Sequence, residues 1–86
     1  MRFGDWLKQE RLARRIVLRE MAERLQWPPA EYSQIERSIM APPEDISGLL
    51  QMLGIAAGSG PYQRAYQMAQ IAQNMLPATY QDEWSQ

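Results

Sequence analysis

The sequence contains neither cysteine nor histidine. Without cysteine, the chain can form no disulfide, no thiolate metal site and no cysteine nucleophile. Without histidine, it lacks the commonest general base and the commonest zinc ligand. Catalysis would then need carboxylates, lysine or serine in a deep pocket, and an 86-residue chain has little room for one. We therefore expect no enzyme, no metal site and no cofactor.

Long apolar runs are also absent. No run approaches the roughly 18 residues of a membrane span, and the first residues lack the apolar segment of a signal peptide. The sequence thus predicts a cytoplasmic protein without membrane contact. At 86 residues it is one small domain, near the lower limit for a single core, and such chains often gain stability by oligomerising.

Charge is unevenly distributed, although the net charge is only −1. Residues 1–40 contain eight Lys/Arg and six Asp/Glu, a balance of +2, whereas residues 41–86 contain one and four, a balance of −3. A basic first half can mark a polyanion partner. The alternative is a solvated, salt-bridged helical surface, which is the usual meaning of such a charge run.

Apolar spacing predicts an all-α chain, because no segment alternates with period two. Helices are expected at about 4–14, 18–25, 29–37, 46–53 and 61–76. In the first helix, the inner face should carry Phe3, Trp6, Leu7 and Leu12, with Gly4 as the cap. The third should begin at its prolines and turn Tyr32 and Ile35 inward.

The last predicted helix has a stripe of small and flexible residues, suited to close helix packing. The stripe comprises Tyr62, Ala65, Tyr66, Ala69, Ala72 and Met75. It can pack back on its own domain or pair with a second copy. We predict a homodimer through residues 61–86, because Tyr80 and Trp84 would otherwise form exposed aromatic surface. Residues 1–55 would then be the core and 56–86 the dimerisation element.

Four short motifs occur in a familiar order: FGxxLxxxR at 3–11, MAERL at 21–25, SQIER at 33–37 and LxxLG-I ending at Ile55. Together they resemble the lambda-repressor-like helix-turn-helix domain of the xenobiotic-response-element family of bacterial and phage regulators. The resemblance covers residues 3–55. It implies a compact five-helix, all-α domain in which residues 18–25 and 29–37 form the helix-turn-helix.

The resemblance also implies an ion pair between Arg11 and Glu36, which would tie the first helix to the end of the third. The alternative is two unrelated surface charges. Family members commonly have glycine at the positions of Arg15, Gln26 and Ser38, where the chain turns. A non-glycine residue can adopt the left-handed conformation at a cost of about 1 kcal/mol, so these turns can be reshaped rather than lost.

In this family the N-terminal half of the third helix reads DNA bases. Here that half begins with Pro28 and Pro29, which have no side-chain donor or acceptor. Ala30 can touch a thymine methyl, Ser33 can bind a base or a phosphate, and Gln34 can contact adenine with two hydrogen bonds. Gln34 could equally be an ordinary exposed polar residue.

The resemblance assigns phosphate contacts to four arginines, Arg14, Arg15, Arg19 and Arg37. The predicted function is therefore a sequence-specific transcriptional regulator that binds double-stranded DNA, of the phage-repressor or antitoxin kind. Val17 and Leu18 depart from the family, since they replace its usual capping residue and a phosphate-holding glutamine. The alternative is a degenerate helix-turn-helix that binds other proteins through an apolar surface of Val17, Leu18, Trp27 and the prolines.

Overall fold

A computed structural model describes residues 1–78, and these residues form five α-helices and no strand. The helices are α1 (Phe3–Ala13), α2 (Leu18–Leu25), α3 (Pro29–Glu36), α4 (Ser47–Met52) and α5 (Gly60–Met75). This confirms the predicted all-α class, and the helix ends fall within about one residue of those expected. Pro29 occupies the first turn of α3, where its missing N–H leaves no bond unmade.

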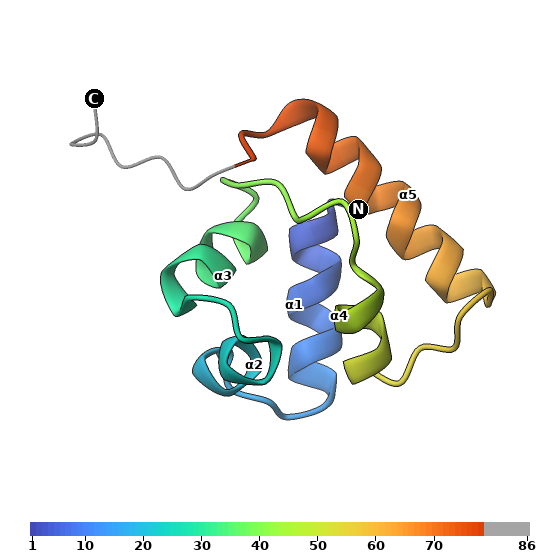
Figure 1. The fold of residues 1–86 in the computed structure, drawn as a ribbon. Coiled ribbons are helices and arrows are strands. Elements are labelled where there is room, and N and C mark those ends of the chain that lie inside the picture. The colour runs from blue at the N-terminus through green and yellow to red at the C-terminus, as the bar shows by residue number, and fades with distance from the viewer. Residues whose placement is uncertain (79–86) are drawn as a thin grey trace.

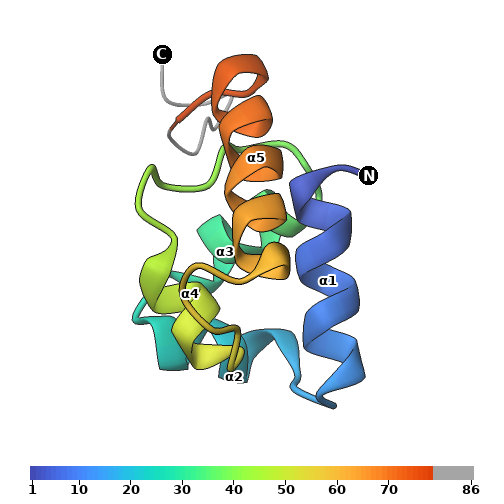
Figure 2. The ribbon, with the colours of Figure 1, turned by 90° about the vertical axis from the view of Figure 1, so that its right-hand side faces the viewer.

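The first helix packs against both α3 and α5. Figure 1 shows α2 and α3 on one side of α1 and α5 on the other, and Figure 2 shows α5 from its exposed side. Ala65 and Ala69 of α5 are fully buried and belong to the same core as residues of α1 to α4. The small-residue face of α5 therefore packs back on its own domain, one of the two outcomes left open by the sequence.

A single hydrophobic core joins the five helices. Its largest fully buried side chains are those of Phe3, Leu7, Met21, Tyr32, Ile46, Leu49 and Leu50. Tyr32 and Ile35 point inward as predicted. Leu12 does not, because the inner side of α1 runs from Leu7 to Arg11, and Leu12 lies about 100° further round the helix with 54% of its surface exposed.

Gly4 has a different role from the predicted helix cap. The capping position is Arg2, and Gly4 lies inside the first turn of α1. A Cβ atom at Gly4 would lie 2.5 Å from the carbonyl oxygens of both Ile35 and Glu36. Glycine at this position therefore allows α1 to approach the end of α3 more closely than any other residue would permit.

Three turns contain a residue other than glycine in the left-handed conformation. Arg15, Gln26 and Ser38 have φ angles of 56°, 60° and 60°. Gln26 is the residue that ends α2, and its N–H donates to the carbonyl of Glu23. Each of these left-handed residues lowers the stability of the folded state by about 1 kcal/mol.

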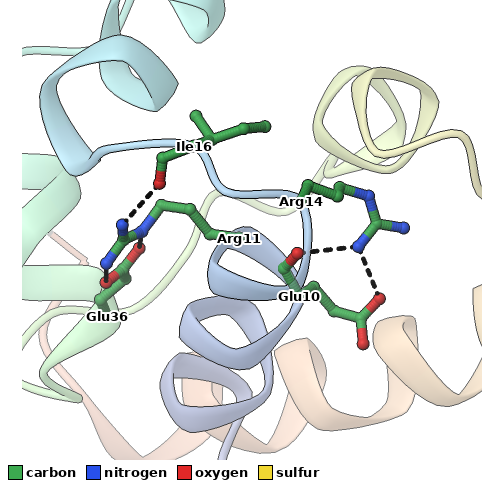
Figure 3. Close-up of polar contacts among 5 residues, drawn as sticks. All are labelled: Glu10, Arg11, Arg14, Ile16 and Glu36. Atoms are coloured by element: carbon green, nitrogen blue, oxygen red, sulfur yellow. Dashed lines mark hydrogen bonds and ion pairs between the residues drawn. The ribbon is translucent and has the colours of Figure 1, made fainter.

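The structure contains the ion pair between Arg11 and Glu36. The Arg11 Nε donates to Glu36 Oε2 at 2.6 Å and Nη2 donates to Oε1 at 3.0 Å, while Nη1 donates to the carbonyl of Ile16 at 2.8 Å (Figure 3). Both side chains are buried. The hydrogen bond to Glu36 raises the pKa of Arg11 above its ordinary value, so the guanidinium stays charged. One guanidinium thereby joins α1, α3 and the turn between α1 and α2.

Replacement of Arg11 by methionine should destabilise the domain by about 3–5 kcal/mol, because it leaves the Glu36 carboxylate buried and unpaired. Urea unfolding measures the loss. Arg24→Met is the matched control, since it removes an exposed pair with Glu20 worth about 0.3–0.5 kcal/mol. An Arg11→Met variant as stable as Arg24→Met would contradict the importance of the buried pair.

Replacement of Gly4 by alanine should destabilise the domain by about 1–3 kcal/mol, because the new methyl group must displace the backbone of α3. Gly48→Ala is the control: it is also in a helix, but its Cβ would meet no atom within 4 Å. The control should be neutral or stabilising by up to about 1 kcal/mol. Thermal unfolding of both variants checks the contrast, and equal melting temperatures would refute the close approach.

Candidate nucleic-acid interface

The outer face of α3 carries all three candidate base contacts. Its inward face consists of Tyr32, Ile35 and Glu36. Ala30, Ser33, Gln34 and Arg37 follow one another at i, i+3, i+4 and i+7, so they lie along one row on the other side. Ala30 and Arg37 are exposed, and Ser33 and Gln34 are partly exposed. The structure thus brings Ala30, Ser33, Gln34 and one candidate phosphate contact together.

The start of α3 presents little hydrogen-bonding chemistry. Pro28 occupies the capping position, Pro29 begins the helix, and no side chain caps its N-terminus. Both rings are exposed. The first turn of α3 therefore offers apolar surface, and side-chain hydrogen bonding on the outer row falls to Ser33 and Gln34.

Arg14 does not lie free on this surface. Its Nε and Nη2 donate to the carbonyl of Leu53 at 3.0 and 2.8 Å. Its Nη1 donates to the carbonyl and to the carboxylate of Glu10 at 2.8 and 3.0 Å. Figure 3 shows Arg14 and Arg11 reaching in different directions from α1. Arg14 thus ties α1 to the end of α4, and a phosphate contact by Arg14 stays a prediction.

The other three candidate phosphate contacts are exposed. Arg15 lies in the turn before α2, Arg19 in the first turn of α2, and Arg37 at the end of α3. Within residues 1–78, none of the three makes an ion pair or a side-chain hydrogen bond. These guanidinium groups are therefore available for a ligand.

Acidic groups limit the positive charge of the surface. Arg24 is paired with Glu20 at 3.1 Å, and Glu23 on α2 is exposed. Glu31 precedes Gln34 by three residues, so the two are neighbours on α3. Positive charge is consequently stronger near Arg37 than at the start of α3.

The apolar surface of the alternative function is only partly present. Val17 is 66% exposed at the capping position of α2, which has no side-chain cap. Leu18 and Trp27 are instead partly buried against the core, and the Trp27 ring packs on Tyr32 with 6.0 Å between ring centroids. In the described part of the chain, the exposed apolar residues near α3 include Val17, the two prolines and Ile39, which is 45% exposed just after the helix.

Over the residues that the structure describes, no three His, Cys, Asp or Glu side chains gather closely enough to hold a metal ion. In the same part of the chain, no helix has the length and apolar character required to cross a membrane.

Comparison with known proteins assigns no family to this chain. No protein-family model, no curated protein and no solved structure matches it. The candidate interface is therefore defined by the geometry and charge of its own residues, namely the outer row of α3 and the exposed guanidinium groups of Arg15, Arg19 and Arg37.

Proposed function

We propose that this protein is a sequence-specific, DNA-binding transcriptional regulator with a lambda-repressor-like helix-turn-helix fold. The observation that carries the proposal is the outward row on α3, which ends in Arg37, together with Arg15 and Arg19, which are exposed and have no partner within residues 1–78. In the proposed complex α3 enters the major groove and α2 crosses the backbone.

The chemistry of the outer row supports reading of a few bases. The amide of Gln34 offers one donor and one acceptor in the arrangement that matches the N6 and N7 atoms of adenine. Ser33 offers a hydroxyl that can donate or accept, and Ala30 offers a methyl group that can touch thymine. With two prolines before them, these residues would give modest specificity per copy.

The three exposed arginines support the general affinity. Each phosphate that is neutralised by an arginine releases counterions, so binding weakens as salt rises. Three contacts give a slope of log K against log salt of about −2.7, and a dimer would double it. Arg19 is exposed, whereas Ala22, its neighbour three residues later on α2, is fully buried. Arg19 therefore lies at the edge of the helix face that packs on the core.

We propose that the protein acts as a homodimer that forms through α5. Ile71 and Met75 are neighbours at i and i+4 on this helix and are 60% and 77% exposed. Ala65 and Ala69 are buried against their own domain, so a second copy would contact the outer side of α5. Tyr80 and Trp84, which also motivated the dimer, lie outside the described residues. A dimer can place two α3 helices about one turn of DNA apart.

A protein-interaction module is the second candidate function. The exposed Val17 favours it, because an apolar residue replaces a capping residue at the start of α2. In either function the protein is proposed to work in the cytoplasm without a cofactor and without catalysis.

Arg19→Gln and Arg37→Gln should each weaken binding to mixed-sequence duplex DNA and reduce the salt slope by about 1. Arg64→Gln is the matched control, because it removes the same charge from α5 on the far side of α1 (Figure 1). Gln34→Ala should leave binding to mixed DNA nearly unchanged and reduce discrimination for a selected site by about 1–3 kcal/mol. Fluorescence anisotropy across a salt series measures these effects. Absence of binding even at low salt would refute the proposal and favour the interaction module.

Replacement of both Ile71 and Met75 by serine should convert the proposed dimer to a monomer, because the apolar surface of α5 is lost. Val17→Ser removes a comparable exposed apolar side chain from α2 and should leave the dimer intact. Sedimentation equilibrium distinguishes the states. A wild-type chain that remains monomeric at high micromolar concentration would rule out the dimer.

A further inference from the structure

The last described residues of the chain lie beside α3. The backbone N–H of Ala41 donates to the carbonyl of Pro77 at 2.8 Å, which fixes this end against the loop that follows α3 (Figure 1). Ala78 borders a groove of about 220 Å³. The rest of the groove is lined by Trp27, Glu31, Ile35, Met40, Ala41 and Pro43. The groove is open, mostly apolar, and next to the outer row of α3.

Eight residues, 79–86, follow Ala78 with the sequence TYQDEWSQ. This segment contains two aromatic residues, Tyr80 and Trp84, and two carboxylates, Asp82 and Glu83. It contains no lysine or arginine. Its composition therefore complements an apolar groove that lies close to Arg37, an arginine with no partner among residues 1–78.

The path from the groove to that arginine is short. Glu31, Gln34 and Arg37 follow at intervals of three residues, so each neighbours the next, and Arg37 is turned by about 120° from Glu31 around α3. Glu31 lines the groove, and Arg37 lies about 9 Å further along the helix axis. Asp82 is four residues after Ala78, so it can reach up to about 14 Å from it.

We propose that residues 79–86 bind to α3 of their own chain, with an aromatic side chain in the groove and the carboxylates of Asp82 and Glu83 over Arg37. The segment then covers Gln34 and occupies a cation that DNA would need. Because the segment is covalently attached, its effective concentration is in the millimolar range, which suits a weak contact. The contact itself does not depend on the proposed function, but its consequence, competition with DNA, rests on it.

The absence of cysteine gives a direct test in the full-length chain. Ser85→Cys creates a single site for a spin label, and amide NMR signals report on residues near the label. We expect selective loss of signals at residues 31–37 and little loss in α5. Asp82→Asn with Glu83→Gln should relieve the loss, whereas the control pair Asp5→Asn with Glu44→Gln, which changes the net charge equally, should not. Equal signal intensity across residues 1–70, including residues 31–37, would overturn the proposal.

A mixed sample shows whether the segment that binds α3 belongs to the same chain or to a second copy. Isotope-labelled chains without the spin label are combined with unlabelled chains that carry it. Signal loss in this sample would show that a second copy supplies the segment, which would overturn binding within one chain. Undisturbed signals, together with selective loss in the singly prepared sample, would support it.

DNA binding provides the functional measurement. The Asp82→Asn, Glu83→Gln variant should bind duplex DNA about threefold more tightly than wild type at low salt. The control pair changes the net charge equally, so its affinity should rise only by the general effect of the added positive charge. Selective NMR signal loss without DNA binding by any variant would support the contact and refute the proposed function. DNA binding that the tail substitutions leave unchanged relative to the control pair would refute the competition.

Discussion

The buried pair between Arg11 and Glu36 is the constraint on which the arrangement of helices depends. Its guanidinium makes hydrogen bonds to α3 and to the turn before α2, so three segments share one charged group. Because Glu36 lies on the inward side of α3 with Tyr32 and Ile35, the pair helps to fix the rotation of α3 about its axis. Ala30, Ser33, Gln34 and Arg37 face outward as a consequence. A buried ion pair is weak evidence for net stability, so we interpret its role here as one of orientation.

Close approach of α1 and α3 accompanies this pair. Gly4 lets the backbone of α1 lie against the carbonyls of Ile35 and Glu36, and the ion pair holds the same two helices two turns further along α1. On the other side of α1, Ala65 and Ala69 of α5 play a comparable role, since small side chains allow two helices to pack tightly. Ile71 and Met75 are left on the outside of α5, where they would be available to a partner.

Much of this architecture can be read from the sequence, since helix spacing, the prolines and Gly54 mark where helices begin and end. Gly54 indeed adopts a φ of 76° after α4, and the motif order points to the Arg11–Glu36 pair. The partner of Arg14 could not be found in this way. Its acceptor is the carbonyl of Leu53, 39 residues away, and a backbone acceptor leaves no trace in residue identity. The role of Gly4 was missed for a similar reason, because a close approach between helices depends on tertiary packing.

The left-handed conformations of Arg15, Gln26 and Ser38 have a consequence for the life of the protein in a cell. Each would be relieved by glycine, at a gain of about 1 kcal/mol that the greater freedom of unfolded glycine partly offsets. Small domains have a total stability of only about 5–15 kcal/mol, so three such residues together lower it appreciably. A larger unfolded fraction is degraded faster by proteases. These three turns therefore leave the folded state a smaller margin against proteolysis than the same turns would leave with glycine.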